Sequence, residues 1–274
     1  MTEEFSLVGD LVDRERRSER PALYAAALDR TYSYFDLCNT AAKAGNVLSH
    51  VGVREGDRLV VDADHHPQAV FTFLGAALLG AVTEFASDID PECDARAVVV
   101  PVEREGEFDL PGGSKLVAFG GDPDRPGTTH WEAEVWSENP AFPPTFHDPA
   151  DPVLRGRVGD AVGDAAGDTA GDAGGDGTGD GGSDDARAYS HADLLAAAGE
   201  AVDALDLDAD SRVAVRAPLS DPRAVAAGVL APLVAGGAIA LPNGDAPFDA
   251  TATVVAARGG DDESVVLDVA DVRL

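Results

Sequence analysis

A Gly-Asp pair recurs every fourth residue over 159–180, inside a stretch, 156–186, that carries almost no apolar side chains. Its only sizeable apolar residues are Val158 and Val162, so little apolar surface is available to offset the entropy lost when the backbone is ordered. The closely spaced aspartates also repel one another. We therefore expect a disordered acidic linker, with the rest of the chain folding as segments before and after it.

Carboxylates on a glycine-rich loop also suit Ca²⁺ or Mg²⁺. The period of this repeat is four residues, however, which is unlike the calcium-binding nonapeptide repeat. The stretch also lacks the bulky apolar residues that would anchor each turn of such a structure. The composition favours a solvated linker over a cation site.

The segments on the two sides of the linker resemble each other. A step of 157 positions takes the motif Tyr-Ser-x-x-Asp-Leu at 32–37 onto 189–194, and it takes Gly-Ala-Val at 80–82 onto Gly-Ala-Ile at 237–239. A strand, a helix and a second strand in each copy form a parallel-sheet unit. The sequence therefore predicts an α/β fold of two pseudo-twofold-related α/β subdomains.

The first copy begins with a hairpin over 22–32, followed by a helix that Ser33 caps and that Asp36 supports from the third position. Apolar residues spaced by four, three and four give this helix one buried stripe. The elements predicted after it are a strand at 58–62, a helix from Pro67 to Gly80, and strands at 81–85, 95–102 and 115–119.

The second copy repeats this order, and we expect it to lack the hairpin. Ser190 caps its first helix and Asp193 supports the cap. The later elements are predicted at 212–216, 222–235, 237–241, 251–255 and 264–269. The expected boundaries are a first subdomain at 1–150, a linker at 151–188 and a second subdomain at 189–274.

The formal net charge is −30, and Lys43 and Lys115 are the only lysines. Such a surface repels nucleic acid and anionic lipid. It is typical of proteins from salt-accumulating cytoplasms; an acidic tail that binds basic partners is the alternative. The apolar runs are interrupted and the amino-terminal residues do not form a signal sequence, so we expect a cytoplasmic protein without a membrane span.

No close cysteine or histidine spacing surrounds Cys38 or Cys93, so neither a disulfide framework nor a zinc site is expected. Residues 62–66, Asp-Ala-Asp-His-His, are the nearest approach to a metal cluster, but we interpret them as a loop before a helix. The Gly-Gly-Ser-Lys at 112–115 lacks the spacing of a phosphate loop and is interpreted as a turn.

The order and spacing of residues 29–82 resemble the amino-terminal part of the adenylate-forming superfamily of AMP-dependent synthetases and ligases. That superfamily includes acyl-CoA synthetases, peptide-synthetase adenylation domains and luciferases. Residues 189–238 resemble the subdomain that follows the phosphate-binding loop of this superfamily. The resemblance implies the fold of the amino-terminal half of such an enzyme, and the later motifs of the superfamily do not follow Leu241.

The resemblance also implies where the phosphate-binding loop of the superfamily would lie, just ahead of Ser190 and His191. Counting back places it on 178–186, where Asp185 stands at the position of the expected lysine and Asp184 stands beside it. A phosphate cradle pairs backbone N–H groups and a lysine with an anion, so these aspartates would repel a triphosphate. The degenerate positions of this loop are Thr178, Gly179, Gly181, Gly182 and Asp185.

We therefore expect a degenerate, truncated and catalytically inactive relative, with no catalytic residue, no cofactor and no metal. Its role would be structural, or it would bind a protein partner or a second copy of itself. One alternative is a component of an ATP-dependent acyl-adenylating enzyme of the acid–thiol ligase type, completed by another chain and using ATP and Mg²⁺. A second alternative is a small-molecule binding module, with its ligand in the cleft between the two copies. A catalytic role for His191 is not expected once the loop beside it is lost.

Overall fold

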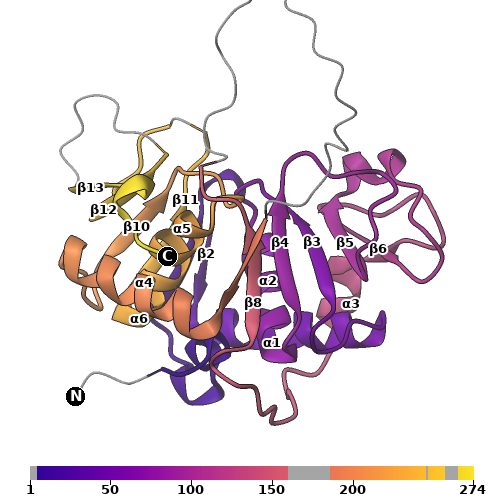
Figure 1. Ribbon diagram of the computed structural model, residues 1–274, viewed down its shortest axis with the longest axis horizontal. Coiled ribbons are helices and arrows are strands. Elements are labelled where there is room, and N and C mark those ends of the chain that lie inside the picture. The colour runs from indigo at the N-terminus through magenta and orange to yellow at the C-terminus, as the bar shows by residue number, and fades with distance from the viewer. Residues whose placement is uncertain (1–4, 160–185, 245, 257–264) are drawn as a thin grey trace, which may run out of the picture.

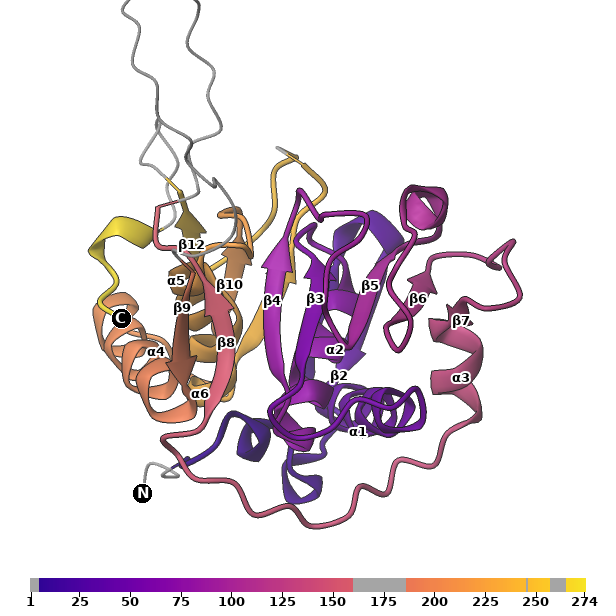
Figure 2. The ribbon, with the colours of Figure 1, turned by 45° about the vertical axis from the view of Figure 1, so that its right-hand side comes forward.

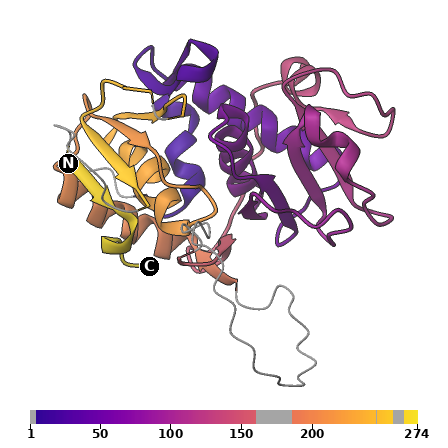
Figure 3. The same ribbon diagram turned by 90° about the horizontal axis from the view of Figure 1, so that it is seen from above.

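The computed structural model of the chain describes residues 5–159, 186–244, 246–256 and 265–274. Within these residues the strands form a seven-stranded sheet and a six-stranded sheet. Figures 1 and 3 show the two sheets in neighbouring halves of the molecule, with the magenta first half beside the orange and yellow second half. The predicted α/β architecture of two related subdomains is confirmed.

The seven-stranded sheet has the strand order β7-β6-β5-β3-β4-β8-β9. Its strands are parallel except for the antiparallel pair at the β8–β9 edge. The bounds are β3 (Arg58–Asp62), β4 (Val82–Ala86), β5 (Ala97–Pro101), β6 (Lys115–Phe119), β7 (Thr129–His130), β8 (Pro152–Gly156) and β9 (Arg187–Ser190).

The six-stranded sheet has the order β13-β12-β10-β11-β1-β2 and again ends in one antiparallel pair, β1–β2. The bounds are β1 (Pro21–Ala25), β2 (Arg30–Ser33), β10 (Arg212–Val215), β11 (Ala238–Leu241), β12 (Ala252–Val255) and β13 (Val265–Asp268).

The α-helices are α1 (Tyr34–His50), α2 (Pro67–Leu79), α3 (Trp131–Ser137), α4 (His191–Leu205), α5 (Pro222–Ala224) and α6 (Ala231–Ala235). Short 3-10 turns lie at Val8–Val12, Arg14–Arg16, Ala26–Leu28, Val102–Glu107 and Val269–Asp271. No helix of the described ranges has both the length and the apolar character that a membrane crossing needs.

The hairpin of each half pairs with the sheet of the other half. The β1–β2 hairpin extends the second sheet, because β1 pairs in parallel with β11, while β8–β9 extends the first sheet, because β8 pairs in parallel with β4. The two hairpins share one register: Pro21 opposes Ser33 as Pro152 opposes Ser190, with a bulge at the corresponding place in each. The exchange ties the two halves into one hydrophobic core.

The expectation that the second copy lacks a hairpin is therefore wrong. Strand β8 and the first half of β9 lie in the range 151–188 that was expected to be linker, and the Gly-Asp repeats come between the two strands. The strand signal was hidden because the two strands are far apart in sequence and each is short. Residues 160–185, which hold most of the repeat, lie outside the described residues.

Both predicted helix caps are present. The Ser33 hydroxyl accepts a hydrogen bond from the backbone N–H of Asp36, and the Asp36 carboxylate accepts one from the N–H of Ser33; Ser190 and Asp193 repeat this arrangement. A short polar side chain at the cap satisfies an amide that the first helical turn leaves without a partner. The local sequence therefore fixes where α1 and α4 begin.

The helix predicted at 222–235 is divided. It contains α5, a π-helical turn at Val225–Leu230 and α6. Pro232 lies one residue into α6 and has no N–H to donate back to the preceding turn, which an uninterrupted α-helix would require.

Candidate functional site

The β8–β9 hairpin fixes where the two ends of the acidic stretch leave the folded protein. Gly156, the last residue of β8, is opposite Arg187, the first residue of β9. Gly156, Arg157 and Ala186 line one wall of a hollow of about 460 Å³. The described residues that flank the acidic stretch therefore lie at this hollow.

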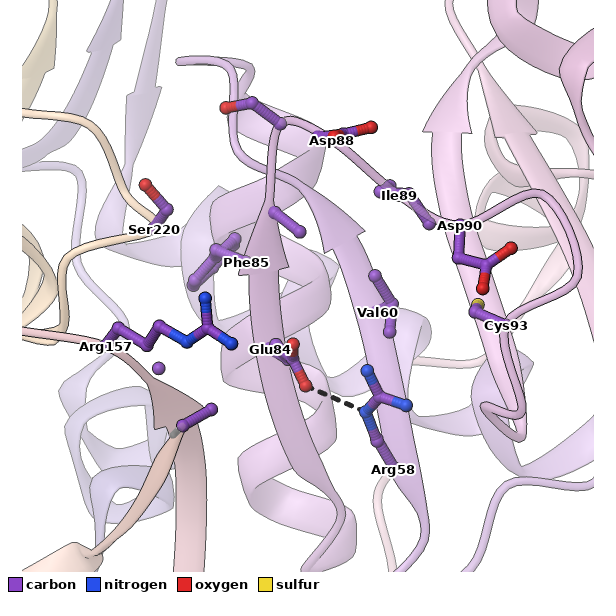
Figure 4. A pocket seen from close by; sticks show the side chains of 14 residues that line it. Arg58, Val60, Glu84, Phe85, Asp88, Ile89, Asp90, Cys93, Arg157 and Ser220 are labelled. Atoms are coloured by element: carbon purple, nitrogen blue, oxygen red, sulfur yellow. Dashed lines mark hydrogen bonds and ion pairs between the residues drawn. The ribbon is translucent and has the colours of Figure 1, made fainter. Parts of the chain in front are cut away.

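Strands β3 and β4 form the floor of the hollow (Figure 4), and Ser220 of the second half reaches its edge. Glu84 on β4 accepts a hydrogen bond of 2.8 Å from Nε of Arg58 on β3, and Nε of Arg155 lies 3.7 Å from the same carboxylate oxygen. Arg157 points toward β4 in Figure 4. The floor is thus a carboxylate held between guanidinium groups.

The rim of the hollow is acidic, since Asp88 and Asp90 lie on the loop that follows β4. Its described lining includes two arginines, Arg58 and Arg157, but no lysine. Arg58 is already paired with Glu84, so its charge is largely neutralised locally. The described lining is therefore of mixed charge and does not form a concentrated anion site.

The thiols are buried. Cys93 lies at the hollow, where burial raises its pKa, and Cys38 is in the core, where burial raises the pKa to about 11. A nucleophilic cysteine needs a lowered pKa, because the thiolate is the reactive form. Both cysteines are therefore suited to packing rather than to nucleophilic chemistry.

The predicted phosphate-loop positions Thr178, Gly179, Gly181, Gly182 and Asp185 lie outside the described residues. Their flanking strands place the stretch between β8 and β9, ahead of the Ser190–His191 pair. This is the order of elements on which the resemblance to adenylate-forming enzymes depends.

His191 is fully buried at the start of α4. Its Nδ1 accepts a hydrogen bond of 3.1 Å from the backbone N–H of Val8, and its ring stacks on that of His147 at 6.4 Å between centroids. Burial, with a smaller contribution from His147, lowers its pKa to about 4. The ring is thus neutral at pH 7, and it joins the amino-terminal turn to α4.

Residues 62–66 do not converge on one point. The Asp62 carboxylate is 2.6 Å from a guanidinium nitrogen of Arg104, Nε2 of His65 is 2.9 Å from the Ala217 carbonyl oxygen, and the His66 ring packs edge-on against Phe119. These partners lie on different elements. Residues 63–66 form the loop between β3 and α2, as the sequence predicted.

Sequence reasoning missed a second group of side chains, Glu55, His147 and Asp151, each of which offers a ligand atom within 4.8 Å of the other two. Glu55 is in the turn after α1, while His147 and Asp151 are in the segment between α3 and β8. No local spacing relates the glutamate to the other two residues, so a motif search cannot find the group.

Comparison with known proteins finds a family match in the amino-terminal part of the chain. Residues 12–106 match the family of AMP-binding enzymes. The 4-coumarate–CoA ligase of Vanilla planifolia is 33% identical over 70 residues, which is 26% of this chain and 13% of the ligase. The curated relative is therefore matched over only a small part of its own length.

Solved structures are similar over most of the described fold. An anthranilate CoA ligase in complex with anthranoyl-AMP has a TM-score of 0.71 at 18% identity, covering 90% of this chain and 49% of that chain. The amino-terminal subdomain of Klebsiella oxytoca NpsA, in complex with anthranilyl-AMSN, has a TM-score of 0.64 at 16% identity, covering 92% and 61%. The chain thus spans about half the length of the first of these enzymes.

Proposed function

We propose that this chain, which has the fold of the amino-terminal half of an adenylate-forming, acyl-CoA ligase-like enzyme, does not activate a carboxylic acid by itself and instead acts as a structural or partner-binding protein. The observation that carries this proposal is the place of the Gly-Asp stretch. It joins β8 to β9 immediately ahead of Ser190, where the resemblance puts the phosphate-binding loop.

Electrostatics support the proposal. Two unit charges of like sign about 4 Å apart repel by about 1 kcal/mol in water, and by more where water is excluded. At the position where a lysine would bind a triphosphate, the stretch has aspartates. Asp88 and Asp90 add negative charge at the rim of the hollow. The arginines at its floor are engaged with or adjacent to Glu84.

The competing function is that of a component of an acyl-adenylating enzyme completed by another chain. The observation that favours it is that this chain covers 49% of the anthranilate CoA ligase. A second chain, equivalent to the other half of that ligase, would supply the remaining groups. ATP and Mg²⁺ would then bind across the two chains. A small-molecule binding module is favoured only by the hollow itself, which lies where Ser220 of the second half meets the first sheet.

ATP–pyrophosphate exchange separates these functions. The purified chain is assayed in molar KCl with Mg²⁺ and a panel of carboxylic acids that includes 4-coumarate and anthranilate. We expect exchange at the level of the no-protein blank, because the triphosphate is not held. Exchange by the chain alone would refute the proposal.

Exchange that requires the product of a neighbouring reading frame would establish the two-chain enzyme instead. A thermal shift with one of the acids, without exchange, would establish the binding module.

A further inference from the structure

We propose that Glu55, His147 and Asp151 bind a divalent transition-metal ion, in a site separate from the hollow described above. One nitrogen and two carboxylate oxygens face one another within 4.8 Å. The segment that carries His147 and Asp151 runs along the lower edge of the molecule from α3 to β8, beneath α1 (Figure 2). The site therefore joins this segment to the turn between α1 and β3.

His147 provides the observation that points to a ligand. Its side chain is only 4% exposed, and its Nε2 lies 3.2 Å from the carbonyl oxygen of Leu78. Because a carbonyl oxygen only accepts, Nε2 must carry the hydrogen. In the neutral ring Nδ1 is then unprotonated and has a free lone pair. A metal-bound histidine commonly has this arrangement, with its second nitrogen donating to a backbone carbonyl.

Nδ1 of His147 is buried and has no hydrogen-bond partner among the described residues. Its nearest charged neighbour is Oε1 of Glu55 at 3.8 Å, which is beyond hydrogen-bond distance. Nδ1 and the two carboxylate oxygens, all of them acceptors, thus lie within 4.8 Å of one another. Such a group is stabilised by a cation, since mutual repulsion of the acceptors otherwise opposes it.

The backbone leaves room for the group. Gly80 ends α2 with φ of +75°, and a Cβ there would lie 2.5 Å from Cε1 and 2.8 Å from Nδ1 of His147 and 3.1 Å from Cγ of Glu55. The backbone N–H of Gly56 donates to the Gly80 carbonyl oxygen at 2.8 Å, which holds the Glu55 turn beside this glycine. Only a glycine permits both side chains at this place.

Asp151 is also fixed. One of its carboxylate oxygens accepts a hydrogen bond of 2.8 Å from the N–H of Asp148, and its carbonyl oxygen accepts one of 3.2 Å from the N–H of His191. Glu55, in contrast, has a side chain that is 67% exposed, so it can rotate inward at little cost. Two ligands are preorganised and the third closes the site.

The donor set selects the metal. Imidazole nitrogen suits Zn²⁺, Co²⁺ and Ni²⁺ better than Mg²⁺ or Ca²⁺, which prefer an all-oxygen shell. Three protein ligands leave a fourth position to water, as in open zinc sites, where bonds are about 2.0–2.2 Å. We therefore expect Zn²⁺ to bind with one ion per chain.

Isothermal titration with Zn²⁺ tests the site on the full chain, after treatment with a chelator and dialysis into molar KCl, which screens general attraction to an acidic protein. The variant is His147→Gln, whose amide can still donate to the Leu78 carbonyl. We expect one tight equivalent in the parent chain and a loss of affinity of about tenfold or more in the variant. Co²⁺ absorption in the visible range reports the same site by spectroscopy.

His130→Gln is the matched control, because His130 also lies between two carboxylates, Asp122 at 3.1 Å and Glu132 at 3.4 Å, but these face different ring nitrogens. We expect it to leave zinc binding unchanged. Glu55→Gln, at an exposed turn, decides the question if His147→Gln does not fold, and it should weaken binding severalfold. The proposal would be overturned if a folded variant, His147→Gln or Glu55→Gln, bound zinc as tightly as the parent chain. Weak binding without a defined stoichiometry in the parent chain would also overturn it.

Discussion

Gly75→Val is expected to destabilise the protein by about 3 kcal/mol or more, a substantial part of the about 5–15 kcal/mol by which a typical domain is stable. Gly75 lies on α2 where it crosses α1. A Cβ at this position would be 2.6 Å from the backbone nitrogen of Gly45 and 2.7 Å from the carbonyl oxygen of Ala41. Because both contacts are to backbone atoms of a helix, no side-chain rotation can relieve them.

The reciprocal contact confirms how close the crossing is. A Cβ on Gly45 would lie 2.8 Å from the carbonyl oxygen of Gly75 and 2.7 Å from Cε2 of Phe142. Any larger residue at Gly75 must therefore push α1 away from α2 and open the core that both helices cover. The loss should affect the first half and, through the exchanged hairpins, the second.

Urea denaturation at constant molar KCl measures this effect. The control is Gly199→Ala in α4, since a Cβ on Gly199 meets nothing within 4 Å. There the substitution should stabilise the protein by about 0.5–1 kcal/mol, because alanine is the better helix former. Equal unfolding midpoints for Gly75→Val and the parent chain would show that the helices do not cross at this distance.

Loss of structure at low ionic strength is the second expected result. The formal net charge is −30, and twenty lysines and arginines face fifty aspartates and glutamates. The Debye length is about 30 Å at 0.01 M salt and about 3 Å at 1 M, so mutual repulsion extends across the molecule in dilute buffer and is short-ranged in molar salt. Some ion pairs of the described residues, such as Arg20 with Asp210 and Arg212 with Asp249, are exposed on both sides, and such pairs contribute little individually.

Far-UV circular dichroism at increasing KCl concentration measures this dependence. We expect a folded spectrum at molar salt and loss of helix signal in dilute buffer. Changing the aspartates of the six Gly-Asp pairs to asparagine tests where the repulsion arises, and the salt requirement should persist because most carboxylates lie outside the repeat. A spectrum that does not change between dilute buffer and molar salt would contradict the account. The substituted positions are Asp160, Asp164, Asp168, Asp172, Asp176 and Asp180.

The elements that the sequence predicts well are those with a local cause. Ser33 and Ser190 cap α1 and α4 with their own side chains, and Gly80 ends α2 in the left-handed conformation that glycine adopts without strain. Lys115–Phe119 is a strand with the predicted bounds, and its run of apolar residues is buried between β5 and β7. Such features depend on a few neighbouring residues, which a sequence displays directly.

The features that the sequence did not reveal depend on contacts between distant segments. Leu154 and Tyr189 are paired across the β8–β9 hairpin although the whole acidic stretch separates them in sequence. The residues near either one do not predict this pairing. The exchange of hairpins depends on which sheet edge has room for a strand. The Glu55, His147 and Asp151 group likewise exists only because the segment from α3 to β8 passes beneath α1.

Titration of Mg·ATP into the folded chain in molar KCl, followed by calorimetry, tests the central claim most directly: that an acidic stretch occupies the place of the phosphate-binding loop. The account predicts no saturable binding up to a nucleotide concentration of about 1 mM, which corresponds to a binding free energy weaker than about −4 kcal/mol. Saturable binding of one nucleotide per chain, with a dissociation constant well below that concentration, would contradict it.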